Sequence, residues 1–267
     1  MQVFGTPTYM SGLCARTIGH GPMLVLLHGG AGSRTHWIKN VPALSAHFTV
    51  ITLDLPGFGE SATPPQGLAA DDYLLWVAQA IRMAVNDQPF HLAGFSFGGA
   101  VSGGVTALLA AQGHPPACLS LISPSGFGKP VGRAVQLEKV PKKHDASEQE
   151  IKAVTARNLG RWMLASEPSV DDPAVDLHLH NVSLAQFDSR LISFENSLIS
   201  NLRGLSLRTQ ILLGEKDPLI FPSHLERKAL LNQSLPQARV DIIPGAGHWL
   251  QYEASAAVNA RINQFHL

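Results

Sequence analysis

An apolar strand-like run, a serine between two glycines, and a helix-like run follow one another between residues 90 and 111. Residues 90–93 have the composition of a short buried strand, and the residues after Gly99 have that of a helix. Gly94 and Gly98 enclose Ser96 between the two runs, and a turn too tight for Cβ atoms requires glycine at such positions. A strained turn of this kind exposes the central serine hydroxyl above the end of a strand. The segment therefore predicts that Ser96 is a nucleophile.

Further apolar runs alternate with helical stretches along the chain, at residues 23–27, 48–53, 118–122, 209–213 and 240–243. Continuous apolar strands separated by helices are typical of a mostly parallel sheet that helices cover on both faces. In such a sheet the active groups gather on the loops at the carboxyl ends of the strands. We therefore expect an α/β fold with its site at that edge.

The alternation is interrupted between residues 128 and 205, where the pattern predicts helices instead of strands. Ser147 and Glu150 form a capping box that begins one helix, and Asp172-Pro173 is a typical start of a second. Residues 184–202 form a third amphipathic stretch. We expect a core in two parts, 1–127 and 206–267, with residues 128–205 inserted as a helical lid above the strand ends.

The nucleophile requires a general base, because a serine hydroxyl is not nucleophilic at neutral pH. Asp217 follows the apolar run 209–213, and His248 lies on a glycine-rich loop after the run 240–243. A helix over residues 223–232 fits the spacing between them. The order serine, aspartate, histidine predicts a catalytic triad of Ser96, Asp217 and His248.

Stabilisation of an oxyanion is predicted at the segment His28-Gly29-Gly30-Ala31-Gly32, which follows the first apolar run. Its exposed backbone N–H groups can meet the oxyanion of a tetrahedral intermediate together with the N–H of Phe97. We choose Gly30 as the second donor and leave Ala31 as the alternative. His28 is interpreted as a brace for the loop.

These motifs together resemble the α/β-hydrolases over nearly the full chain, and Asp54-Leu55-Pro56-Gly57-Phe58-Gly59-Glu60-Ser61 is similar to the family's D-x-x-G-x-G-x-S turn. The resemblance implies an α/β-hydrolase fold and nucleophilic catalysis by Ser96. A serine at this position argues against the dehalogenase and epoxide hydrolase branches, which have aspartate there. It favours hydrolysis of a small carboxylic ester or lactone through an acyl-enzyme, as in the carboxylesterase branch.

A second branch is similar in one further segment. Residues 247–253, Gly-His-Trp-Leu-Gln-Tyr-Glu, resemble the G-H-W-x-Q-W-E segment of the meta-cleavage-product hydrolases, which cleave C–C bonds in vinylogous diketo acids. That branch also has an Arg-Trp pair in its lid, comparable to Arg161-Trp162, whose arginine binds the substrate carboxylate. The chain departs from it at Phe95, where the branch usually has Asn. The resemblance makes Phe95, Arg161, Trp162 and Trp249 candidate substrate-binding residues. A small-molecule receptor or an acyltransferase on the same fold is a further alternative.

Composition limits the partners. Lys and Arg together number 20, as do Asp and Glu, and this balance argues against nucleic acid and against a polybasic membrane patch. Neither a signal peptide nor a run long enough to span a membrane is visible, and Cys14 and Cys118 show no paired spacing. We expect a cytoplasmic protein with reduced thiols, no cofactor, no metal-ligand motif and a small-molecule substrate. A homo-oligomer is left open.

Overall fold

The computed structural model describes residues 2–130 and 135–267. Residue 1, part of the N-terminus in which no signal peptide was expected, and residues 131–134 of the expected lid lie outside the described residues. Eight strands form one sheet in the order β1-β2-β4-β3-β5-β6-β7-β8. The neighbours from β4 to β8 run parallel, whereas β1 and β2 are antiparallel. The strands are Thr6–Met10, Leu13–Gly19, Met23–Leu27, Thr49–Leu53, Phe90–Phe95, Cys118–Ile122, Arg208–Gly214 and Ala238–Ile243.

The six parallel strands agree with the predicted runs, whereas the hairpin of β1 and β2 was not predicted. Four of the five residues of β1 are exposed, so the strand shows no apolar pattern in the sequence. The strand β2 buries its first three residues beside β4. The sheet is therefore longer than the sequence pattern indicated.

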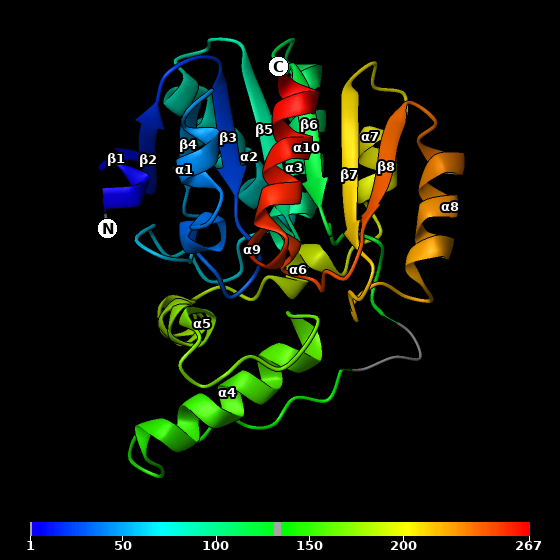
Figure 1. Ribbon diagram of the computed structural model, residues 1–267. Helices are drawn as coiled ribbons and strands as arrows, with labels where there is room; N and C mark the ends of the chain where they lie inside the picture. Colours follow the sequence, from blue (N-terminus) through cyan, green and yellow to red (C-terminus); the bar gives the residue numbers. More distant parts are fainter. Residues whose placement is uncertain (1, 131–134) are drawn as a thin grey trace.

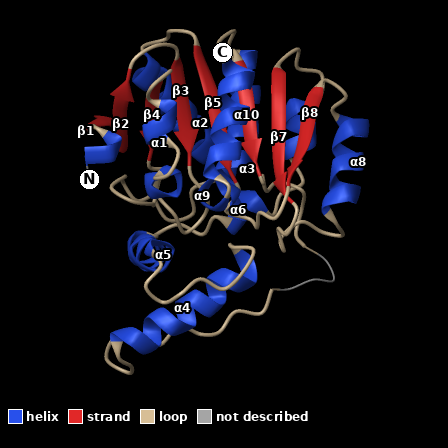
Figure 2. Ribbon diagram, viewed as in Figure 1, coloured by secondary structure: helices blue, strands red, loops and turns tan. Residues whose placement is uncertain are grey.

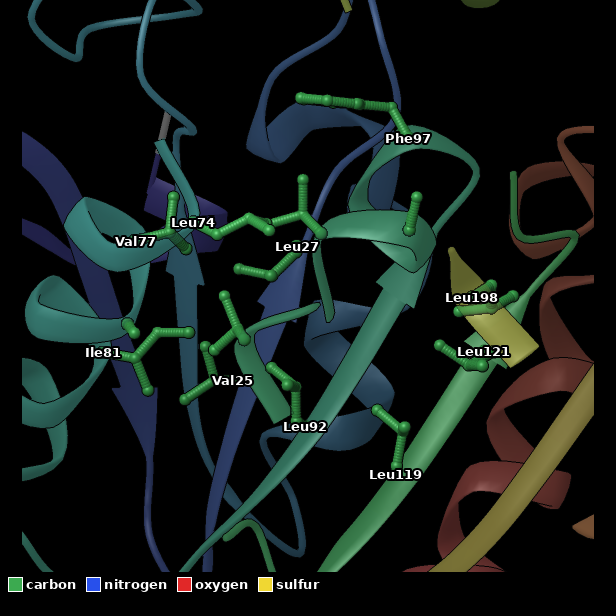
Figure 3. Packing of buried hydrophobic residues seen from close by; sticks show 14 of the residues in the cluster. Val25, Leu27, Leu74, Val77, Ile81, Leu92, Phe97, Leu119, Leu121 and Leu198 are labelled. Atoms are coloured by element: carbon green, nitrogen blue, oxygen red, sulfur yellow. The ribbon is translucent and has the colours of Figure 1, made fainter. Parts of the chain in front are cut away.

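Helices cover both faces of the sheet (Figures 1 and 2). The long helices α2 (Ala70–Val85) and α3 (Phe97–Ala111) lie on one face, and α1 (Val41–Leu44) and α10 (Ser255–His266) lie on the other. Alternate strand residues supply two apolar layers. Figure 3 shows part of the first, which includes Leu27, Leu92 and Leu119 of the sheet and Val77 and Ile81 of α2. Shorter helices are η1 (Gln2–Phe4), η2 (Arg34–Trp37), α8 (His224–Ser234) and α9 (Leu250–Glu253).

The segment between β6 and β7 is helical, as predicted, and α4 (Glu148–Trp162) and α5 (Pro173–Leu184) lie beyond the carboxyl ends of the strands in Figure 1. The capping box of Ser147 and Glu150 is present, and the Asp172 carboxylate accepts a hydrogen bond from the N–H of Ala174. The division at residues 128 and 205 stays a prediction.

The third amphipathic stretch, residues 184–202, contains two short helices, α6 (Arg190–Ser193) and α7 (Leu198–Leu202). The chain becomes extended at Ala185, and the Asp188 carboxylate accepts the N–H of Arg190 as a new turn begins. Leu198 of α7 is fully buried in the apolar layer of α3, so this end of the insertion packs with the core. None of the helices described by the structure is long and apolar enough to cross a membrane.

Candidate active site

Ser96 is the single residue between the end of β5 and the start of α3, and its backbone is strained, with φ 51° and ψ −115°. The flanking glycines permit two close backbone approaches. A Cβ on Gly94 would lie 2.3 Å from the carbonyl oxygen of Gly98, and a Cβ on Gly98 would lie 2.4 Å from that of His28. The two glycines therefore allow the turn to close against β3 and leave the Ser96 side chain at the sheet edge.

Ser96, His248 and Asp217 form one continuous line of hydrogen bonds. Nε2 of His248 lies 2.8 Å from Oγ of Ser96, and its Nδ1 lies 2.7 Å from Oδ2 of Asp217. The second oxygen of Asp217 accepts the N–H of Leu219 at 2.8 Å, which fixes the carboxylate. Asp217 follows β7 and His248 follows β8, so three loops at the same edge of the sheet bring together the three residues that the sequence predicted.

Two buried histidines hold the glycine-rich loop after β3. Nδ1 of His28 lies 2.8 Å from the carbonyl oxygen of Gly29, and its Nε2 accepts the N–H of Leu55 at 2.9 Å. Nδ1 of His36 accepts the N–H of Gly29 at 3.1 Å. Burial lowers the pKa of both imidazoles, that of His36 well below its usual value, so both rings are neutral at pH 7. The carbonyl oxygen and the N–H of Gly29 are therefore each hydrogen-bonded to a buried imidazole.

The N–H groups of Gly30 and Phe97 have no hydrogen-bond acceptor within the described parts of the chain. Both residues line the same cavity as Ser96. Phe97 is the first residue of α3, so its N–H is one of the donors that a helix leaves unpaired at its start. The arrangement offers two backbone donors beside the serine.

The loop that carries His248 is bonded to the end of α4. The N–H of Trp249 donates to the carbonyl oxygen of Met163 at 2.7 Å. The Glu253 carboxylate accepts the N–H of Gly247 at 2.8 Å and that of Ala165 at 2.7 Å. Burial raises the pKa of Glu253, although both of its oxygens have donors. Two hydrogen bonds, Trp249 to Met163 and Ala165 to Glu253, therefore join this loop to the inserted segment.

A cavity of about 880 Å³ opens at Ser96 and extends under the inserted segment. Its lining is mainly apolar and includes Phe127, Trp162, Phe194, Leu219 and Ile220. The charged residues of the described lining are three cations, Lys129, Arg190 and Arg227, and the carboxylate of Asp217. A site of this kind accommodates a small, largely apolar molecule and favours an anionic group on it.

Two of the four candidate substrate-binding residues line the described cavity, and two do not. Phe95 lines the cavity, with its ring centroid 5.1 Å from that of His248, and Trp162 lines it from α4. Arg161 is outside the described lining, because its guanidinium pairs with Glu138 at 2.7 Å. Trp249 is also outside it, because its indole is fully buried and stacks on another ring. The expectation that Arg161 and Trp249 contact the substrate is therefore not supported by their positions.

Arg227 on α8 is the cavity residue that the sequence pattern missed. Its Nη2 donates to the carbonyl oxygen of Phe221 at 2.9 Å, and its Cζ lies 3.7 Å from the ring centroid of Phe127. Its Nη1 is buried and has no acceptor among the described residues. Burial lowers the pKa of this guanidinium, and the charge of Asp217 opposes the shift. The spacing predicted the helix, but not which of its charged side chains faces the cavity.

The described lining contains one imidazole and one carboxylate, those of His248 and Asp217. These two are bonded to each other, and the described lining holds no further imidazole, thiol or carboxylate.

A model described as the alpha/beta hydrolase family matches residues 24–261, and the chain belongs to this family. The acetyltransferase component of an acetoin cleaving system, a dihydrolipoyllysine-residue acetyltransferase of Pseudomonas putida, is 32% identical over 253 residues. The match covers 92% of this chain and 63% of that protein. The chain thus spans less than two thirds of this relative.

Two solved structures share the fold. One is a protein described as a putative aryl esterase from Burkholderia cenocepacia, with 25% identity, a TM-score of 0.75, and coverage of 95% of this chain and 93% of that one. The other is a meta-cleavage product hydrolase from Pseudomonas fluorescens, with 20% identity, a TM-score of 0.73, and coverage of 100% and 98%. The family match and these two structures together show the alpha/beta hydrolase fold.

Proposed function

We propose that this enzyme hydrolyses small carboxylic esters or lactones through an acyl-enzyme formed on Ser96. The observation that carries the proposal is the hydrogen-bonded line from Asp217 through His248 to Ser96 at the opening of an apolar cavity. This order of groups is what nucleophilic attack by serine requires.

In the proposed mechanism, Nε2 of His248 takes the proton of Ser96 as Oγ attacks the ester carbonyl carbon. Asp217 holds the imidazole with its Nδ1–H toward the carboxylate and stabilises the imidazolium. The N–H groups of Gly30 and Phe97 donate to the oxyanion. His248 then protonates the leaving alcohol, and a water that His248 deprotonates attacks the acyl-enzyme to release the acid.

The cations of the cavity favour a substrate with a carboxylate besides its ester group. Arg227 is the best placed, because its guanidinium lies over the ring of Phe127 and its Nη1 has no partner among the described residues. A small rotation of the guanidinium would present its donors to a carboxylate in two-point geometry. Arg227 would take the role that the sequence assigned to Arg161.

Cleavage of a C–C bond in a vinylogous diketo acid is the second candidate. Trp162 on the cavity wall and the cation of Arg227 favour it, since such a substrate has both an apolar part and a carboxylate. Phe95 opposes it, because it places an apolar ring beside His248. Transfer of the acyl group to an alcohol or thiol would use the same first step and differ only in the acceptor.

The test is turnover of a panel of aryl esters, lactones and ring-cleavage diketo acids by the wild-type enzyme, Ser96→Ala and Ser193→Ala. Ser193 lines the same cavity and is a matched control. We expect ester turnover that Ser96→Ala lowers by about 10⁶-fold and that Ser193→Ala leaves nearly unchanged. Mass spectrometry of the quenched reaction should detect the acyl group on the peptide that contains Ser96. Diketo acid turnover without ester turnover would support the second candidate, and product formation only with an added acceptor would support acyl transfer.

A further inference from the structure

His91, Cys118 and His266 come together at the opposite end of the sheet from the Ser96 cavity. His91 is the second residue of β5, Cys118 begins β6, and His266 ends α10 (Figure 1). One ligand atom from each, an imidazole nitrogen or the thiol sulfur, lies within 4.8 Å of the other two. No sequence pattern predicted this group, because its members are spread over 176 positions of the chain and no two share a motif.

The sheet register places these side chains on one face. Leu92 pairs with Leu119, so His91 and Cys118 are side by side on adjacent strands and point in the same direction. Both point away from the apolar layer of α2 and α3 and toward α10, which crosses this face. The position of the group is therefore fixed by two central strands and a helix.

Each of the two imidazoles has one buried ring nitrogen that makes no hydrogen bond with the described residues. These nitrogens are Nδ1 of His91 and Nδ1 of His266, and neither has a partner in the part of the chain that the structure describes. Cys118 is a free cysteine that is 2% exposed. Buried polar atoms without partners are uncommon in folded proteins, and two of them beside a thiol call for a ligand.

A further pair of side chains orients His266. Nε2 of Gln210 donates to Oγ of Ser120 at 2.7 Å, and this hydroxyl lies 2.6 Å from Nε2 of His266. If the proton of His266 is on Nε2, the ring donates to Ser120 and its Nδ1 presents a lone pair. Imidazoles that bind metal ions typically make such a hydrogen bond through the nitrogen that faces away from the metal.

We propose that His91, Cys118 and His266 form a binding site for a divalent, borderline-soft metal ion of the zinc type. Two imidazole nitrogens and one sulfur are ligands that such an ion prefers, and water would complete a tetrahedral site. His91 is only partly buried, so it provides both an entry path and a position for that water. The thiol of Cys118 loses its proton to solvent as the metal–sulfur bond forms, and no redox step is involved.

Metal binding requires the three ligand atoms to move closer together. Zn–S and Zn–N bonds of about 2.3 and 2.0 Å place tetrahedral ligand atoms roughly 3.5 Å apart. The present separations of up to 4.8 Å shorten to this value by rotation of the histidine rings. The bound ion would link the last turn of α10 to β5 and β6, and binding would stabilise the folded state.

The test is a titration of chelator-treated protein with Co²⁺, followed by displacement with Zn²⁺. We expect a thiolate-to-cobalt charge-transfer band that saturates at one equivalent, disappears with Zn²⁺, and is accompanied by a higher melting temperature. Cys118→Ser should abolish the band, and Ser120→Ala should weaken metal binding by about 10–100-fold. Cys14→Ser is the matched control, because Cys14 is also buried and free but its thiol donates to Glu60.

Absence of the band in the folded wild-type protein would overturn the proposal without recourse to any variant. A band that persists in Cys118→Ser and is lost in Cys14→Ser would also overturn it, since the metal would then bind elsewhere. Esterase activity is not part of this readout, so the result is independent of the function proposed for Ser96.

Discussion

Replacement of Gly98 by Ala tests whether the close backbone contact at the serine turn sets the geometry of the oxyanion donors. The new Cβ would lie 2.4 Å from the carbonyl oxygen of His28 and 2.8 Å from that of Leu27. Cβ atoms essentially never approach closer than 3.0 Å, so the start of α3 and the loop after β3 must separate by at least 0.6 Å. Both contacts are backbone atoms, which have little freedom to move aside.

The separation acts on the two N–H donors at once, because Phe97 is on α3 and Gly30 is on the loop. Loss of one oxyanion donor costs about 10²–10³ in kcat, so we expect Gly98→Ala to lower kcat by about 10²-fold or more. The cost in stability is smaller. Overpacking costs about 1–3 kcal/mol, and the higher helix propensity of alanine returns up to about 1 kcal/mol.

Gly104→Ala on the same helix is the matched control. Its new Cβ would meet Cδ1 of Leu74 at 2.6 Å, the tip of a side chain that can rotate. We expect kcat to stay within about threefold of the wild type, because rotation of the Leu74 side chain leaves a steric cost of only about a few tenths of a kcal/mol. The assay is steady-state hydrolysis of an aryl ester, with melting curves for both variants. A folded Gly98→Ala enzyme with wild-type kcat would refute the reasoning.

Three further predictions concern single side chains. Glu253→Gln retains one acceptor for two N–H donors, and we expect a loss of about 1–2 kcal/mol in the free energy of unfolding and a lower kcat, measured by urea denaturation and ester hydrolysis. Arg227→Gln should lower kcat/KM by about 10–100-fold for an ester that carries a carboxylate and leave kcat/KM for a neutral analogue nearly unchanged. Arg161→Gln should change kcat/KM for the two esters equally. Equal losses on both esters in Arg227→Gln would contradict the carboxylate role. Burial lowers the pKa of His266 to about 3, so between pH 6.5 and 3 the unfolded chain takes up a proton that the folded protein does not. The free energy of unfolding therefore decreases as the pH falls through this range. In a chelator, the fall in unfolding free energy from pH 6.5 to pH 5 should be smaller in His266→Gln by up to about 1.4 kcal/mol per pH unit.

The positions of Ser96, Asp217 and His248 were readable from the sequence because each residue follows an apolar strand of a parallel sheet. Strand ends on one edge of such a sheet must be close in space, so the order of Ser96, Asp217 and His248 was enough to place them together. The six strands were visible for the same reason, since burial on both faces leaves a continuous apolar run.

Other features depend on information that a local pattern lacks. The strand β1 is mostly exposed and left no apolar signal. Which arginine faces the cavity depends on helix phase and on competing carboxylates: Glu138 pairs with Arg161, whereas Arg227 has no such partner among the described residues. The contact of His91 with Cys118 and His266 depends on strand order and on the path of the last helix.

The bonds between the His248 loop and the end of α4 limit how the cavity can open. The carbonyl of Met163 is hydrogen-bonded to Trp249 and the N–H of Ala165 to Glu253, both close to His248 in the chain. A displacement of this end of α4 would therefore move the imidazole away from Ser96. The C-terminal end of α4 must behave as a fixed pivot, and a substrate has to enter by motion of the more distant parts of the insertion.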